Sequence, residues 1–597
     1  MGRLIRGYMR TARLLPGARG RGAGAGLPLT AMPVVLALLL AACAQPGPSV
    51  QSGDERGAEQ GQAAAPRRTM VMAARVEPQG LANKLLISSN DTRSARRLLN
   101  AFLMVTDDKG DTHPYLASAL PRLDTDSWRV FPDGRMETAY ALRPNLTWHD
   151  GTPLGAEDFV FALRVVTDPE AGPMWQANPQ NLIEDVLAPD PRTVVIRWRE
   201  SFPGAAQLNE NDFNPLPRHI LEQQFARDRA EAFANHGYWN REYVGLGPFK
   251  LDRWEPGAFM EMSAFDGHAL GRPRIDRVRF VWISDPNTAL ANLLAGDVHV
   301  AVNNSMQFQQ GAILEREWAS RGGGTVVRSA REARFIQIQF RPDVQIQRAF
   351  FDLRVRQGLA HSIDRQALVD GLLEGQSIIA DTFPPPQMAY YQTLLGSIAR
   401  YPFDIRQADQ RLAEAGWTKG NSGFYTNAAG ERFTADFRAF AGGQEERELA
   451  IMVDGLRRNG WDLTSTLVPE ITTRDVMMRA TFPSLTANVT QLREDVILNK
   501  LQGYNIPFAE NRWAGFNRGA WANAEFDRLD RLFNTTLERG QRDQIMMQLM
   551  RILHDDVGVI PLYYNPDTLA HSASLRGPTA SAPETLREWN VYEWELR

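Results

Sequence analysis

The side chain most suited to a chemical reaction is the thiol of Cys43, the only cysteine among 597 residues. It directly follows an apolar run at residues 34–42, and the first thirty residues carry six arginines and no acid. A basic segment followed by a short apolar one is the pattern of an export signal. The run is too short to cross a bilayer as a permanent helix, and small residues precede Cys43. We therefore expect cleavage before this residue.

Residues 40–43, Leu-Ala-Ala-Cys, resemble a bacterial lipobox. The resemblance implies that the thiol of Cys43 becomes a thioether to diacylglycerol and that the new amino terminus is acylated too. Each buried methylene of an acyl chain adds about 0.8 kcal/mol, so several chains anchor a protein more firmly than one. We expect an exported protein in the periplasm or on the outer face of the cell membrane, held to the membrane only by this lipid. The flanking residues disfavour the alternative, a buried cysteine in a cytosolic core.

Other patterns that could do chemistry have structural interpretations. His149 and Asp150 are adjacent, but neighbouring side chains on a strand point to opposite faces, and Asp-Gly at residues 150–151 is a turn signal. The histidines show no H-E-x-x-H or paired-ligand spacing, which argues against zinc. Gly245 and Gly247 lack the third glycine of a dinucleotide loop, so we interpret them as a tight turn. No P-loop occurs, and no Gly-x-Ser-x-Gly follows the signal. We expect no enzymatic activity and no cofactor or metal.

Composition is typical of a large exported globular protein. Residues 1–42 carry six arginines and no acid, so their removal takes the net charge from −4 to −10. This argues against a nucleic-acid partner, which requires a basic face. Without a cysteine after residue 43, neither disulfides nor a thiolate metal site can form. About 550 residues remain, enough for two or three lobes. The Gly-, Ala-, Gln- and Ser-rich start predicts a flexible tether at residues 43–69.

Strand and helix signals alternate along the rest of the chain, which predicts a mixed α/β fold. Ile336 and Ile338 alternate with Gln337 and Gln339, a period of two that places the apolar side chains on one face of a sheet. Further strands are predicted at residues 83–88, 137–142 and 193–198. Helices are predicted at residues 156–166, 286–295, 353–362, 365–373, 407–415, 445–459, 525–536 and 541–556.

Residues 142–161 carry the strongest resemblance to a known family. They read Leu-Arg-Pro-Asn-Leu-Thr-Trp-His-Asp-Gly-Thr-Pro-Leu-Gly-Ala-Glu-Asp-Phe-Val-Phe. This stretch resembles the signature of extracellular solute-binding protein family 5, which includes oligopeptide- and dipeptide-binding proteins of ABC importers. Residues 245–249 are similar to that family's Gly-Thr-Gly-Pro-Phe turn, and residues 352–365 to the helix entering its second lobe. Further matches, in family order, lie at residues 295–298, 413–417 and 560–563.

The chain departs from the family pattern at some positions. Gly155 stands where the family usually has Thr, and Gly358 and Ser362 stand where Ala is usual. Residues 486–496 lack the aromatic and acidic Asp-Pro stretch that peptide binders often carry.

The resemblance implies an α/β, periplasmic-binding-protein-like fold with two lobes, of the large, type II-like kind, and an extra inserted small domain. Lobe I would comprise residues 70–115, 242–340 and 565–597, and lobe II residues 341–564. Residues 116–241 would form the inserted domain. The crossovers at residues 340–343 and near Asn565 are the expected hinges.

The resemblance also implies a function. A monomeric, lipid-anchored receptor would bind a peptide or similar small solute between its lobes and pass it to ABC permease subunits, which work with separate ATPases. Asp495 or Glu494 would pair with a ligand amine and Arg493 with a carboxylate. Aromatic side chains would form apolar or stacking walls, and an asparagine would donate hydrogen bonds. The candidates for these last two roles are Trp513, Phe516, Tyr563 and Asn517.

Several alternatives stay open at this point. The same fold could bind a non-peptide solute such as an opine, an oligosaccharide or a metal chelate. The protein could serve a sensor or surface adhesion instead of transport. A secreted hydrolase, with acid–base chemistry in a carboxylate-rich cleft, is a further alternative.

Overall fold

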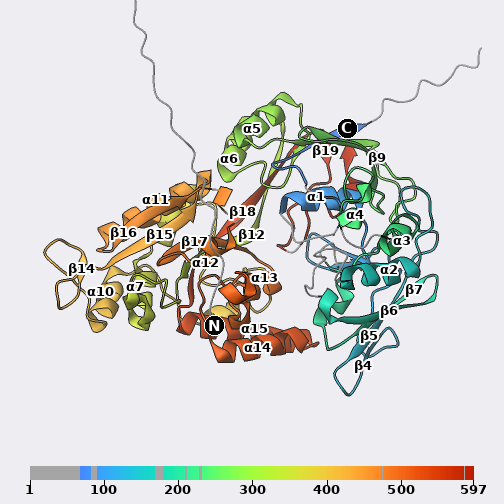
Figure 1. Cartoon of the computed structure of the whole chain (residues 1–597). Helices are drawn as coiled ribbons and strands as arrows, with labels where there is room; N and C mark the ends of the chain where they lie inside the picture. The colour runs from blue at the N-terminus through green and yellow to red at the C-terminus, as the bar shows by residue number, and fades with distance from the viewer. Residues whose placement is uncertain are drawn as a thin grey trace, which may run out of the picture. The chain divides into compact units, whose positions relative to one another are not determined.

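Ten strands among the described residues form one mixed sheet (Figure 1). The computed structural model describes residues 68–78, 80–82, 90–168, 179–208, 212–227, 231–469, 471–472, 475–583 and 585–597, all within a compact unit of residues 65–597. In spatial order the strands are β16 Asp462–Val468, β15 Thr434–Phe440, β17 Leu485–Gln491, β12 Gly324–Ile338, β18 Val559–Ser572, β11 Val300–Ala301, β1 Thr69–Ala74, β10 Arg277–Trp282, β9 Phe259–Ala264 and β8 Phe249–Glu255. Cys43 and the strand predicted at residues 83–88 lie outside the described residues.

Smaller sheets and helices complete the mixed α/β fold, which confirms the predicted class. A second sheet contains β4 Trp128–Val130, β5 Met136–Ala141, β7 Thr193–Trp198 and β6 Ile183–Asp190. Three strand pairs are β2 Met104–Thr106 with β3 Thr112–Pro114, β13 Thr418–Lys419 with β14 Tyr425–Thr426, and β19 Leu575–Arg576 with β20 Glu595–Leu596. The helices are α1 Asn90–Leu99, α2 Ala156–Thr167, α3 Arg218–Arg227, α4 Glu231–Ala234, α5 Pro286–Ala295, α6 Phe308–Ala319, α7 Leu353–Ser362, α8 Arg365–Leu373, α9 Tyr391–Ser397, α10 Ile405–Glu414, α11 Gly443–Arg458, α12 Val476–Ala480, α13 Glu494–Asn499, α14 Ala524–Thr535 and α15 Arg539–Asp555.

Three helices begin and end at the residues predicted from sequence, because side-chain caps define their first turns. Asp285 caps α5 by accepting from the Thr288 N–H at 2.8 Å, and Asp352 and Asp364 cap α7 and α8 in the same way. An aspartate at this position satisfies backbone donors that have no partner within the helix. The other predicted helices are present with ends shifted by one or two residues, where ends fray. Among the described residues, no helix is long and apolar enough to span a membrane.

Strands β12 and β18 are the long elements shared by several cores. They pair antiparallel from Gly324 opposite Ser572 to Gln337 opposite Val559. At one end, Val327 packs against the first core, a cluster containing β1, β10 and the second sheet. At the other end, the two faces of β12 pack in separate clusters, the second core with Ile336 and the third core with Phe335. Strand β12 therefore passes from the first core to the other two near Arg331. The crossover between lobes expected at residues 340–343 lies later in the chain.

Burial on both faces of β12 differs from the simple alternation expected from the sequence. Ile336 and Ile338 share one core face, as predicted, but Gln337 and Gln339 are also fully buried. The polar side chains are accommodated by hydrogen bonds, such as that from Gln339 Nε2 to the Phe482 carbonyl at 2.9 Å. The limits of the lobes and of the inserted domain stay predictions.

Two sequence motifs meet in the first core, and their contacts explain their residue types. The ring of His149 accepts from the Gly245 N–H through Nδ1 and contacts the Gly247 carbonyl through Nε2, each at 3.1 Å. Burial lowers the pKa of His149 to about 4, so the ring is neutral at pH 7. A Cβ added at Gly247 would lie 2.3 Å from the Leu99 carbonyl carbon. The glycines thus allow close approach of two backbones, which is a more specific reason than the predicted tight turn. His149 is a packing residue, as predicted.

Candidate functional site

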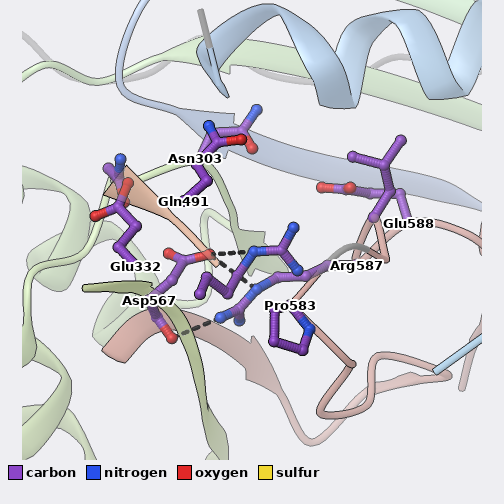
Figure 2. A pocket seen from close by; sticks show the side chains of 10 residues that line it. Asn303, Glu332, Gln491, Asp567, Pro583, Arg587 and Glu588 are labelled. Atoms are coloured by element: carbon purple, nitrogen blue, oxygen red, sulfur yellow. Dashed lines mark hydrogen bonds and ion pairs between the residues drawn. The ribbon is translucent and has the colours of Figure 1, made fainter. Parts of the chain in front are cut away.

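A polar pocket lies at the crossing of β12 and β18 (Figure 2). Its volume of about 40 Å³ admits a few water molecules or one small polar group, such as an ammonium ion. The pocket is lined by Asn303, Asn304, Arg331, Glu332, Gln491, Asp567, Pro583, Leu586, Arg587 and Glu588. These residues come from the loop after β11, from the crossing strands, from the end of β17 and from the C-terminal segment.

A β-bulge brings two consecutive side chains of β12 to this pocket. The register with β18 shifts between Ala330 and Glu332, so Arg331 has no directly opposed partner. Consecutive residues of a regular strand point to opposite faces, whereas an extra residue in a bulge re-aims its side chain. Arg331 and Glu332 can therefore both line the pocket.

One side of the pocket is a carboxylate held by two guanidinium groups. Asp567 Oδ2 lies 3.0 Å from Nε of Arg587, a pair that Figure 2 shows, and 3.8 Å from Nε of Arg331. The Arg331 guanidinium also donates to Ser581 Oγ at 3.2 Å. Burial lowers the pKa of Arg587, but Asp567 opposes the shift. The Asp567 carboxylate is thus neutralised within the protein, and its ion pairs tie the C-terminal segment to the crossing strands.

The other side is the carboxylate of Glu332, which has no basic partner within ion-pair distance among the residues that the structure describes. The hydrogen bond that its side chain makes with a described residue is a long contact from Asn565 Nδ2 at 3.5 Å. Burial and the charge of Asp567 raise its pKa, while Arg334 and Arg331 act in the opposite direction. A half-buried carboxylate without a cation at ion-pair distance can accept a hydrogen bond from an amine or another donor of a ligand.

A chain of hydrogen bonds leads from Glu332 into the second core. Gln444 Nε2 donates to Asn565 Oδ1 at 2.8 Å and contacts the Tyr563 hydroxyl at 3.1 Å. That hydroxyl donates to Glu448 at 3.2 Å. Glu448 in turn lies 2.7 Å from Arg334, which ends the chain on the same strand as Glu332. The pocket and the core of α11 are thus linked through polar side chains.

Three candidate residues predicted from sequence lie at the start of α13, just after the pocket residue Gln491. Arg493 and Asp495 pair with each other, with a shortest distance of 2.9 Å, and Asp495 is 55% exposed. Glu494 lies 2.9 Å from Arg539 and accepts from the Tyr390 hydroxyl at 3.0 Å. Glu494 is therefore neutralised within the protein, whereas the carboxylate of Asp495 is accessible. Their contacts with ligand stay predictions.

The other candidates fall into exposed and buried groups. Phe516 is 47% exposed, and Trp513 is half-buried. The Asn517 amide is buried and donates to the carbonyls of Leu501, Gln502 and Trp521 at 2.7–3.1 Å. Its donors are used within the protein. Tyr563 is fully buried and belongs to the hydrogen-bond chain above, so it reaches the pocket only through Gln444 and Asn565.

Sequence reasoning missed the residues that form the pocket. The charged run Arg331-Glu332-Ala333-Arg334 inside a long strand was a usable signal, since charges in a central strand require partners or a site. Asp567 and Arg587 carried no such signal, because their contact depends on where the C-terminal segment folds back. Within the described ranges, no group of three His, Cys, Asp or Glu side chains could hold a metal ion.

Comparison with known proteins identifies the class. Residues 119–483 match the model of the bacterial extracellular solute-binding proteins, family 5. The oligopeptide-binding protein AppA of Bacillus subtilis strain 168 is 23% identical over 569 residues, covering 94% of this chain and 97% of AppA. The structure of Bacillus subtilis AppA in complex with a nonapeptide superposes with a TM-score of 0.69 at 21% identity, covering 89% of this chain and 100% of AppA.

Two further solved structures share the fold. NikZ from Campylobacter jejuni, in complex with Ni(L-His), has a TM-score of 0.70 at 19% identity and covers 89% of this chain and 100% of its own. AgaA from A. tumefaciens R10, in complex with agropinic acid, has a TM-score of 0.65 at 18% identity and covers 89% and 98%. The predicted periplasmic-binding-protein-like fold is confirmed. This chain belongs to the bacterial extracellular solute-binding proteins, family 5.

Proposed function

We propose that this protein is the extracytoplasmic receptor of an ABC importer, anchored by a lipid at Cys43, and that it binds peptides between two lobes. Family membership and the similarity to a peptide-binding relative over nearly the whole chain support this reading. The protein acts as a monomer and passes its solute to permease subunits driven by separate ATPases.

The observation that carries the proposal is the composition of the pocket at the crossing strands. Its walls combine Glu332 and Gln491, beside the second and third cores, with Asn303 and Glu588, beside the first. A group bound there contacts segments of different cores at once. A receptor whose solute holds two lobes together must have a site of this kind.

Closure follows from differential affinity. A solute that touches both bodies binds the closed form more tightly than the open form, and only that difference can shift the population. The bulge of β12 at Arg331, opposite Asn565, is one of two points at which the crossing strands depart from regular pairing, and the other lies between Arg334 and Phe335. Dihedral changes at these points would let the bodies move while their cores stay packed.

The peptide assignment rests on the chemistry of Glu332. A carboxylate without a basic partner suits the protonated amine of a peptide, and the pocket has room for that group but not for a side chain. Asn303 and Gln491 place further polar side chains in the wall of this pocket. Backbone hydrogen bonds along the ligand, with water in the side-chain pockets, would tolerate varied sequences.

A non-peptide solute is the second candidate, favoured by one observation. Residues 486–496 differ from the aromatic and acidic stretch common in peptide binders, and the relatives of the same fold include complexes with a nickel–histidine chelate and with agropinic acid. Both of those solutes also carry amine or carboxylate groups that the pocket could recognise.

Mass spectrometry of small molecules that copurify with the natively expressed protein tests the proposal. Short peptides support the peptide assignment, whereas a chelate, an opine or a sugar supports the second candidate. Calorimetry with the identified solute should then give binding at least tenfold weaker for Glu332→Gln, because a charge-assisted hydrogen bond becomes a neutral one. Chemical conversion of the solute, or scattering profiles that do not change on binding, would contradict a closing receptor.

A further inference from the structure

Helix α6 presents two buried stripes to two different cores. It belongs to predicted lobe I and lies beside α5 (Figure 1). Leu314 and Trp318, four residues apart, pack in a fourth core with β1, α5, β11 and β18. Phe308 and Ala312, also four residues apart, pack in the second core with α7, α8 and α11 of predicted lobe II. At 3.6 residues per turn the two pairs lie on opposite faces, so α6 is sandwiched between the lobes.

The face of α6 toward β12 and β18 is closely packed. A Cβ added at Gly311 would lie 2.8 Å from Thr568 Cγ2. A Cβ added at Gly324, the first residue of β12, would lie 2.7 Å from Cζ3 of Trp318. Glycine at both positions thus lets the helix and its largest side chain approach the strands closely. We therefore expect α6 to move with these strands as one rigid body.

The opposite face of α6 is tied to the end of α8 by polar contacts. Gln309 Nε2 donates to the Leu372 carbonyl at 2.8 Å, and Arg316 lies 3.3 Å from Glu374. The last carbonyls of a helix have no partner within it, so that of Leu372 is available to a side chain of the other lobe. The ion pair is exposed, with 62% and 48% of its two side chains accessible, and contributes little. The hydrogen bond of Gln309 is therefore the stronger polar tie.

The backbone at the end of α8 reverses direction beside α6. Glu374 and Gly375 have φ angles of 50° and 72°, in the left-handed region, and the Glu374 N–H bonds to the Val369 carbonyl. A non-glycine residue adopts this conformation only where surrounding contacts hold it. The contact between Glu374 and Arg316 lies at this reversal.

The start of α6 also lies beside α11, which leads to the pocket at the crossing strands. A Cβ added at Gly443 would lie 3.6 Å from Oε1 of Gln307, the residue before α6. Gln444, the next residue of α11, belongs to the hydrogen-bond chain that reaches Glu332. A displacement of α11 at the pocket would therefore also move the surface that α6 contacts.

We propose that α6 is a latch between the lobes. Phe308, Gln309 and Arg316 hold predicted lobe II in the arrangement seen here and release it when the lobes rotate about the crossing strands. Because α6 is fixed to β12 and β18, such a rotation must break or shift its contacts with α8. The latch thereby sets the ratio of lobe arrangements before any solute binds, and through that ratio the affinity for solute. The inference rests on the closing motion of the proposed receptor.

Distances between the lobes in the solute-free protein give the first test. The only cysteine is replaced by Cys43→Ser in the full-length protein. Spin labels at Ala258→Cys and Ala428→Cys, exposed positions of predicted lobes I and II, then report the distances by pulsed electron paramagnetic resonance. Gln309→Ala should change the ratio of lobe arrangements by about threefold to tenfold, the effect of one hydrogen bond.

Gln310→Ala is the matched control, at the next residue of the same helix. Gln310 Nε2 donates to Asn287 Oδ1 of α5 at 3.0 Å, a contact within predicted lobe I, so the distances should not change. The second test adds Ala-Ala-Ala to the labelled protein and measures its affinity by calorimetry. If Gln309→Ala shifts the solute-free distances toward those of the peptide-bound protein, the peptide must bind more tightly, and a shift away from them must weaken binding.

An unchanged solute-free distribution in Gln309→Ala, or the same change in Gln310→Ala, overturns the latch. An affinity change opposite to that required by the distances overturns it as well. If the latch fails while Ala-Ala-Ala still shifts the wild-type distances, the receptor function stands. A changed solute-free ratio in Gln309→Ala without any binding of Ala-Ala-Ala supports the latch and rejects the peptide assignment.

Discussion

The ion pair of Arg334 and Glu448 provides the sharpest test of how the crossing strand is held in the second core. Glu448 is fully buried, the Arg334 side chain is 5% exposed, and the two lie 2.7 Å apart. Burial opposes the charge of Arg334, but Glu448, Tyr563 and Glu445 together raise its pKa above the usual value. Removing Glu448 therefore leaves a buried guanidinium with a single, half-exposed carboxylate, that of Glu445 at 3.2 Å.

Glu448→Leu should lower the free energy of unfolding by about 3 kcal/mol, the lower end of the cost of breaking a buried pair, because Glu445 remains. For a unit of residues 65–597 that unfolds as a whole, this corresponds to a decrease in melting temperature of about 3 °C. The double variant Arg334→Met/Glu448→Leu replaces both charges by apolar groups and should recover to within about 1 kcal/mol of the wild type. Urea denaturation followed by circular dichroism and tryptophan fluorescence measures both.

Glu445→Gln is the control, since this partly exposed partner should contribute less than about 1 kcal/mol. A loss below 1 kcal/mol in Glu448→Leu, or a double variant whose loss equals the sum of the single ones, would refute the reasoning. The first result would mean that the guanidinium finds solvent, and the second that the two side chains do not interact.

Further predictions concern packing, pH, ligand contact and anchoring. Gly247→Ala should destabilise the protein by about 1–3 kcal/mol or prevent folding, because its Cβ would meet the Leu99 backbone; wild-type stability in denaturation would contradict this. Burial lowers the pKa of His268 to about 3, below its unfolded value. As the pH falls, the unfolded chain takes up a proton at this residue before the folded protein does. The free energy of unfolding should therefore fall by about 2 kcal/mol between about pH 6.5 and pH 5. An equal fall in His268→Gln would exclude this source. Asp495→Ala should weaken binding of an amine-bearing solute with little change in thermal unfolding, and unchanged affinity in calorimetry would remove it from the site. Cys43→Ser should release the protein from the membrane fraction; retention there would disprove the anchor.

Local signals were sufficient for the fold class and for many elements. The helices at residues 286–295, 353–362 and 365–373 were predicted with their true ends, because an aspartate cap and an apolar stripe act within one or two turns of chain. The family motifs were likewise recognisable from short stretches of sequence, although the close approach of Gly247 to the Leu99 backbone is a long-range contact.

The candidate pocket at the crossing of β12 and β18 depends on contacts between residues that are far apart in the chain. Asp567 meets Arg331 only because β18 pairs antiparallel with β12, and a bulge decides that Arg331 and Glu332 both reach the cavity. No pattern of period two or 3.6 encodes a bulge of this kind.

Tertiary packing likewise distinguishes residues that look alike in sequence. Glu494 and Asp495 are adjacent acids, yet the first is neutralised by Arg539 and the second is exposed. Hydropathy and spacing specify which segments become strands or helices, since those depend on neighbours along the chain. Whether a charged side chain such as Glu332 lacks an oppositely charged partner depends on which distant side chains lie beside it. Those neighbours are decided only when the cores pack together.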